Sequence, residues 1–260
     1  MVDGPLAGTT LHDLWTDRRE EIFGSGLEGE RFPLLIKILD ARDDLSIQVH
    51  PPAEVAEQLE GEPKTEMWYI AHADPGAKLY LGLRNGVEIE HFEAAISHGT
   101  VEECVHAVEP RAGESIFIPS GRLHAIGAGL LIYEIQQNSD TTYRVFDWNR
   151  MGLDGQPRDL HVDESLRCID FSDYEPVMDR PDGNTLASCE FFVVERLEIP
   201  EGGALANPDP DRFSILTIVS GELGSRDGRT FRAGDFLLLP RGANQLEASC
   251  PTSVLQTTIP

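Results

Sequence analysis

Two pairs of polar residues, each with its members two positions apart, have side chains that could bind a metal ion. They are Gln48 with His50, and Lys64 with Glu66. In a strand, residues two apart point to the same face, so each pair can face the inside of a β-barrel. Together with His124 they offer two imidazoles, a carboxylate and an amide oxygen, which suit zinc and leave room for water or substrate. We therefore predict one zinc ion per chain, held by Gln48, His50, Glu66 and His124.

His124 closes a spacing pattern that occurs twice. Residues 113–124 follow the pattern G-x5-P-x-G-x2-H. Residues 234–245 have the same spacing but end in Gln245 in place of the His. The pattern predicts a strand, a Pro-x-Gly turn and a side chain that returns into a barrel. Two copies, about 121 residues apart, indicate two similar β-domains.

The elements around these residues are expected to be short strands broken by Gly and Pro. Expected strands cover 32–39, 45–49, 65–71, 78–83, 114–118 and 130–137, and then 190–197, 213–219, 229–232, 235–239 and 253–258. Helices are expected at 11–23, after an imperfect capping box of Thr10 and Asp13, and at 89–98 and 101–104. This order favours an all-β barrel or sandwich over alternating βαβ units.

The predicted domain boundaries follow the repeat and a change in composition. Residues 1–150 form the metal-binding, catalytic barrel with an N-terminal helix, and residues 185–260 form a degenerate second barrel. Between them, 151–184 are rich in Asp, Pro, Gly and Arg and are expected to be a linker with one helical turn.

The charge of the chain excludes several classes of partner. Its 45 acidic and 21 basic residues give a net charge of −24, which repels nucleic acids and anionic membranes. No apolar run approaches the roughly 20 residues of a membrane span, and the N-terminus does not resemble a signal peptide. The four cysteines form no C-x-x-C pair and are expected to be reduced. We expect a cytoplasmic protein, either a monomer or a homodimer.

The repeated spacing resembles the second conserved motif of the cupins, which supplies a metal-binding His. This resemblance implies two jelly-roll β-barrels with a few peripheral helices. In the second half, Ser214 stands where cupins have a Glu, and no H-x-H pair precedes it. The second barrel is therefore expected to be free of metal.

The first half resembles the type I mannose-6-phosphate isomerases in their compact bacterial form. The matching segments are 48–51, 64–67, 124–125 and 134–144. The resemblance implies that Gln48, His50, Glu66 and His124 are the metal ligands. It further implies catalytic roles for Lys64, Glu134 and Arg144, and makes Arg150 a basic residue of the site.

One departure from the family is Pro63, because many longer members have a His at this position that is proposed to assist ring opening. Another group must assist that step here if it is catalysed.

The implied reaction interconverts mannose 6-phosphate and fructose 6-phosphate by moving a proton between C1 and C2 through a cis-enediol. A metal and the Arg144 guanidinium would stabilise the charge that develops on the two oxygens. Lys64 is the first candidate for the proton-transfer base and Glu134 the second. Arg150 and Arg122 are candidates for holding the phosphate, with a structural role as the alternative for both.

Three other functions remain open on the sequence. The chain could isomerise a different phosphorylated sugar, or bind sugar and metal without turnover. An iron dioxygenase of the cupin type is disfavoured by Gln48, because such sites normally present two or three histidines.

Overall fold

The computed structural model describes residues 1–2, 4, 6–151, 155–242 and 245–260, and strands dominate it. The chain divides into two compact units, one of Leu34–Asp179 and one of Met1–Pro33 with Arg180–Pro260. The N-terminal helices thus group with the C-terminal sheets. The boundaries at 150 and 184 stay predictions.

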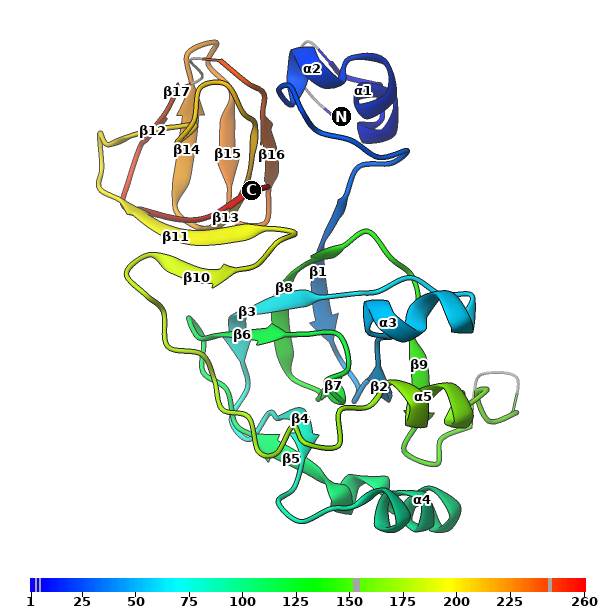
Figure 1. The fold of residues 1–260 in the computed structure, drawn as a ribbon. Helices are drawn as coiled ribbons and strands as arrows, with labels where there is room; N and C mark the ends of the chain where they lie inside the picture. The colour runs from blue at the N-terminus through cyan, green and yellow to red at the C-terminus, as the bar shows by residue number, and fades with distance from the viewer. Residues whose placement is uncertain (3, 5, 152–154, 243–244) are drawn as a thin grey trace. The chain divides into compact units, whose positions relative to one another are not determined.

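The unit Leu34–Asp179 contains two antiparallel sheets (Figure 1). The first has the strand order β1 (Leu34–Ala41), β8 (Leu130–Gln137), β3 (Glu66–Ala73) and β6 (Ser115–Ile118). The second has the order β5 (Val105–Val108), β4 (Leu79–Leu83), β7 (His124–Ile126), β2 (Ile47–Val49) and β9 (Tyr143–Phe146).

An apolar core joins the two sheets of this unit. Trp68, Ile116 and Ile132 of the first sheet pack in one buried cluster with Leu81 and Ile126 of the second. Ile70, Ile118 and Leu130, each two residues from one of these, belong to the same cluster, as expected for side chains on one face of a strand. The unit is therefore a sandwich of two sheets with the core between them.

Helices cover the other face of the second sheet. They are α4 (Ile89–His98), η2 (Val101–Cys104) and α5 (Val162–Cys168), while α3 (Ala53–Ala56) and η1 (Glu57–Leu59) follow β2. Phe92 of α4 and Cys168 of α5 share a buried cluster with Ile47 and Val145 of the sheet. The strands of this sheet are consequently buried on both faces.

The second unit begins with two short helices, α1 (Leu11–Asp17) and α2 (Arg19–Ile22). The predicted capping box of Thr10 and Asp13 is confirmed, but the predicted single helix breaks at Arg18, whose φ of −135° is not helical. Phe23, after α2, packs edge-on against Phe213, with ring centroids 5.0 Å apart. This contact attaches the helices to the sheets of the same unit.

Two further antiparallel sheets complete the second unit. One has the order β10 (Thr185–Ser188), β11 (Val193–Ile199), β18 (Thr252–Thr258), β13 (Ser214–Ser220) and β16 (Phe236–Leu239). The other has the order β12 (Ala204–Ala206), β17 (Gln245–Ala248), β14 (Glu222–Ser225) and β15 (Thr230–Arg232). Their core includes Leu205, Leu216, Leu223, Leu246 and Val254.

The repeated motif has the same backbone in both units up to its turn. Gly113 and Gly234 both have a φ of +92°, a left-handed conformation that favours glycine. The strands that follow pair alike, since Ile118 of β6 lies opposite Glu66 and Leu239 of β16 lies opposite Ser214. Residues 243 and 244 of the second copy lie outside the described residues.

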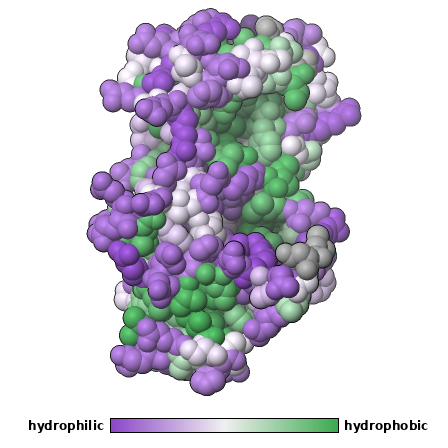
Figure 2. Space-filling model, turned by 90° about the vertical axis from the view of Figure 1, so that its right-hand side faces the viewer, coloured by the Kyte–Doolittle hydropathy of each residue, from purple (hydrophilic) through white to green (hydrophobic). Residues whose placement is uncertain are grey.

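Hydrophilic residues cover much of the face shown in Figure 2, with hydrophobic residues exposed between them. Within the described residues, no helix combines the length and the hydropathy that crossing a bilayer requires.

Candidate metal centre

Four predicted ligands meet at one end of the core of the unit Leu34–Asp179. Gln48 lies in β2 directly opposite His124, the first residue of β7, and His50 follows β2. Glu66, the first residue of β3, comes from the facing sheet. The ligand atoms of His50, Glu66 and His124 all lie within 4.8 Å of one another, and each of these residues is at most 1% exposed.

The distances in this cluster fit a common cation. Nε2 of His50 lies 3.6 Å from Oε2 of Glu66, and Nε2 of His124 lies 3.7 Å from Oε1. The amide nitrogen of Gln48, which is not a ligand atom, lies 3.3 Å from Nε2 of His124. Ligand atoms around a tetrahedral zinc ion lie roughly 3.4 Å apart, given bonds of about 2.0–2.2 Å.

Backbone carbonyls orient both imidazoles. Nδ1 of His50 lies 2.9 Å from the carbonyl oxygen of Thr141, and Nδ1 of His124 lies 2.9 Å from that of Arg122. A carbonyl only accepts, so each Nδ1 donates and each Nε2 turns a lone pair to the cluster. Burial lowers the pKa of His124 to about 3 and that of His50 well below its usual range, so both rings are neutral, as metal ligands must be.

Glu66 is a buried carboxylate whose negative charge needs compensation. Neither of its oxygens makes a well-aligned hydrogen bond among the described residues, although Nζ of Lys64 lies 3.0 Å from Oε2. Burial and the charge of Glu134 raise the pKa of Glu66 to about 7, against the opposing effect of Lys64. Two neutral imidazoles beside such a carboxylate fit a divalent cation.

Two lysines border this cluster. Nζ of Lys64 lies 3.2 Å from Nε2 of His50, so the predicted base stands next to two of the ligands. Lys37 of β1, which the sequence analysis did not assign to the site, lies opposite Glu134 of β8. Its Nζ lies 2.9 Å from Oε1 of Glu134. Trp68 donates from Nε1 to the other oxygen of Glu134, at 3.0 Å. Glu134 therefore holds Lys37 in place with one oxygen while Trp68 fixes the other.

Arg144 lies in β9, opposite Gln48 of β2. It donates from Nε to Oγ of Ser46 (3.2 Å) and from Nη1 to the carbonyl of Asp159 (2.9 Å). Burial, with the charge of Arg158, lowers the pKa of Arg144, but a guanidinium stays charged near neutral pH. The strand pairing thus brings the predicted arginine next to a predicted ligand.

The two arginines predicted to hold phosphate have different surroundings. Arg122 forms two hydrogen bonds with Asp173 (2.8 and 3.0 Å) and a third with the carbonyl of Phe117 (2.7 Å). These contacts favour the structural alternative for Arg122. Arg150 lies 2.7 Å from Oδ1 of Asp147, and Arg158, missed by the sequence analysis, lies 3.6 Å from the same oxygen.

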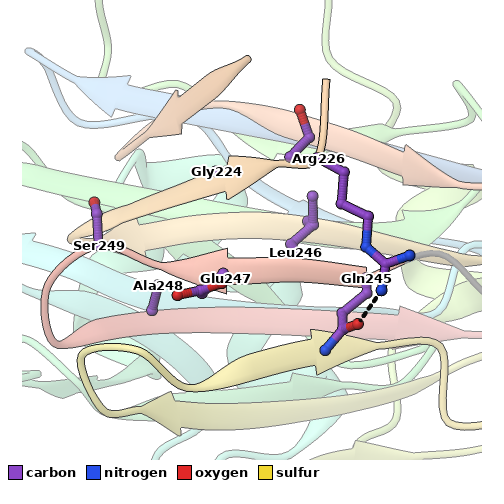
Figure 3. A pocket seen from close by; sticks show the side chains of 8 residues that line it. Gly224, Arg226, Gln245, Leu246, Glu247, Ala248 and Ser249 are labelled. Atoms are coloured by element: carbon purple, nitrogen blue, oxygen red, sulfur yellow. Dashed lines mark hydrogen bonds between the residues drawn. The ribbon is translucent and has the colours of Figure 1, made fainter. Parts of the chain in front are cut away.

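The second unit does not repeat the ligand set. Gln245, which the repeat spacing equates with His124, is exposed, and its neighbour Leu246 is buried in the core. Figure 3 shows Gln245 joined to Arg226 by a hydrogen bond of 2.7 Å. The pocket drawn there is lined by residues 224–226 and 245–249 and belongs to the other unit from the metal cluster.

Hydrogen bonds between neutral side chains fill the corresponding place in the second unit. Ser214, aligned with Glu66, donates to Oδ1 of Asn207 (2.5 Å) and accepts from Nε2 of Gln256 (3.2 Å). Asn207 in turn donates to the carbonyl of Pro240 (2.8 Å). Within the part of the chain that the structure describes, no cluster of imidazoles and carboxylates lies at this place.

Comparison with known proteins identifies the family. A model of the catalytic domain of type I phosphomannose isomerase matches residues 1–65. Mannose-6-phosphate isomerase ManA of Bacillus subtilis is 37% identical over 258 residues, which cover 94% of this chain and 80% of ManA. The chain belongs to the type I mannose-6-phosphate isomerase family. A mannose-6-phosphate isomerase of Streptococcus mutans is 34% identical over 250 residues, covering 92% of this chain and 77% of that protein.

Solved structures agree with this membership. The crystal structure of the mannose 6-phosphate isomerase from Bacillus subtilis superposes with a TM-score of 0.85 at 31% identity, covering 99% of this chain and 84% of that one. A mutant phosphomannose isomerase from Salmonella typhimurium gives a TM-score of 0.73 at 16% identity, covering 96% of this chain and 86% of that one, which shows a shared fold.

Proposed function

We propose that this chain interconverts mannose 6-phosphate and fructose 6-phosphate and that its metal is zinc. The observation that carries the proposal is the convergence of His50, Glu66 and His124 with Lys64, next to the strand that bears Arg144. The family relatives are named for this activity. A protein that only binds sugar would have little use for a buried lysine and a partly buried arginine at the metal.

When bound, zinc would act as a Lewis acid and stabilise the negative charge that develops on substrate oxygens. Arg144 supplies a second positive charge, already fixed by Ser46 and the carbonyl of Asp159, so little reorganisation is needed as the charge develops. Lys64 carries the proton between C1 and C2. Lys37, held by Glu134, is a second nitrogen that can donate a hydrogen bond to a substrate hydroxyl.

For the phosphate we propose Arg150 together with Arg158. Both guanidiniums approach the single carboxylate of Asp147, so the positive charge exceeds the negative charge in this group. The site needs such a local excess because the chain as a whole carries a net charge of −24. Arg122 keeps its structural role in this proposal.

A coupled assay that follows fructose 6-phosphate formation from mannose 6-phosphate tests the activity. We expect turnover with zinc, its loss with a chelator and its return when zinc is added back. Lack of turnover by folded, zinc-loaded protein would contradict the isomerase proposal and favour a binding protein. Faster turnover of another aldose phosphate would instead make the chain an isomerase of that sugar.

Three further expectations belong to the same proposal. The two sheets of each unit are interpreted as a cupin barrel, in keeping with the family. The chain is expected to work in the cytoplasm, as a monomer or a homodimer, on a phosphorylated hexose. Its four cysteines are free thiols in the structure, as the sequence predicted.

A further inference from the structure

The hydroxyl of Ser46 connects a metal ligand to the arginine of the site. Ser46 directly precedes β2, is 4% exposed and lies two residues before Gln48, so both side chains point the same way. Its Oγ donates a hydrogen bond to Oε1 of Gln48 at 3.4 Å and accepts one from Nε of Arg144 at 3.2 Å.

The chemistry of an amide makes this connection important for metal binding. Only the oxygen of Gln48 can bind a cation, whereas in the structure its nitrogen faces Nε2 of His124 and its oxygen faces Ser46. A half turn of the amide exchanges the two atoms. The hydroxyl of Ser46 suits this turned amide, because it can accept a hydrogen bond from Nε2 of Gln48 while it still accepts one from Arg144.

We propose that Ser46 is a positioning residue that holds the Gln48 amide with its oxygen toward the metal and fixes the Arg144 guanidinium beside it. The inference rests on the proposed metal site and extends the proposed function. It predicts that one hydroxyl, which touches neither the metal nor the substrate, affects both metal affinity and turnover.

The test measures zinc affinity by competition with a chelating dye, without any substrate. Replacing a group that orients a metal ligand typically weakens binding by 10- to 100-fold, and we expect Ser46→Ala to do so. Ser46→Thr and Ser46→Val provide a matched pair of nearly equal shape, of which only Thr keeps the hydroxyl. We expect Thr to bind zinc at least tenfold more tightly than Val, even if Ala reduces stability. Ser115→Ala, at a buried serine of β6, is the control and should bind zinc normally.

A double-mutant cycle tests whether the effect passes through the amide. In a Gln48→Ala background, Ser46→Ala should change zinc affinity by less than twofold, because the ligand that Ser46 orients is already absent. In the assay of turnover, Ser46→Ala should lower kcat more than it raises KM, because Arg144 acts on the developing charge.

Equal zinc affinity of the Thr and Val variants would overturn the proposal, and so would an unchanged effect of Ser46→Ala in the Gln48→Ala background. The zinc measurements need no isomerase activity. If the chain bound zinc with this dependence on Ser46 but did not turn over mannose 6-phosphate, the proposed function would fail while the positioning role stood.

Discussion

The pKa values of the metal cluster lead to a quantitative prediction for zinc binding. A ligand must lose its proton before it binds a metal, so metal binding releases the protons that the ligands carry at a given pH. Burial lowers the pKa of His124 to about 3 and that of His50 well below its usual range, so both rings are neutral near neutral pH. The pKa of Glu66 is raised to about 7, so this carboxyl is the ligand that still carries a proton near neutrality.

The size of the effect follows from these values. With a pKa of about 7, Glu66 is about 0.9 protonated at pH 6 and about 0.1 protonated at pH 8, so proton release on zinc binding should fall by about 0.8 between these pH values. Affinity should rise roughly tenfold over the same range, or about 1.4 kcal/mol. Two histidines with an ordinary pKa near 6.5 would instead change the release by about 1.5 protons.

Titration calorimetry in buffers of different ionisation enthalpy counts the released protons directly. The exposed Glu57 provides a control, because Glu57→Gln should leave the count unchanged. A change of about 1.5 protons between pH 6 and pH 8 would show that the histidines are not held neutral. A change near zero would show that Glu66 is already ionised at pH 6.

Three further outcomes are expected. Arg144→Ala should keep its zinc but lose turnover on the order of 100-fold, whereas His124→Ala should lose zinc. Arg196→Ala, at a half-buried arginine of the other unit, is the control. Normal turnover of Arg144→Ala would remove its catalytic role. Arg122→Met should lower the free energy of unfolding by about 2 kcal/mol and leave KM unchanged, because Arg122 bonds to Asp173 and to the carbonyl of Phe117. A raised KM at unchanged stability would restore Arg122 as a phosphate ligand. Because the folded-state pKa of Glu66 lies above its ordinary value, its contribution to stability is complete below about pH 4.5 and is lost as the pH rises through 7. Chelator-treated protein should therefore lose about 3 kcal/mol between pH 4.5 and pH 8 that Glu66→Gln does not lose, as measured by urea unfolding.

One long strand and two helices could be predicted well from the sequence. Strand 130–137 and helices 89–98 and 101–104 have the predicted bounds. The prediction missed β7 and β9, because strands of three and four residues are too short to show a period. It also failed for α1 and α2, where apolar spacing continued across the break at Arg18.

The candidate metal cluster of His50, Glu66 and His124 could be predicted because its residues lie in short motifs, while some of the residues around it could not. Lys37 meets Glu134 only through the register of β1 and β8, and no spacing along the chain contains that register. Arg158 lies between β9 and α5, outside any helix or strand, and the sequence does not predict that it approaches Asp147. The exposure of Gln245 could not be predicted either, since a motif gives the number of residues in a turn but not which face the next strand presents.

The two kinds of support around the ligands have a consequence for how this centre can change. His50 and His124 are aimed by backbone carbonyls, which no point substitution can delete. Gln48 is adjacent to a serine hydroxyl, which a single nucleotide change can remove or replace. If the proposed metal centre is correct, evolution or protein engineering can therefore alter the support of the glutamine most readily, while the carbonyls that orient the histidines remain for as long as the chain folds.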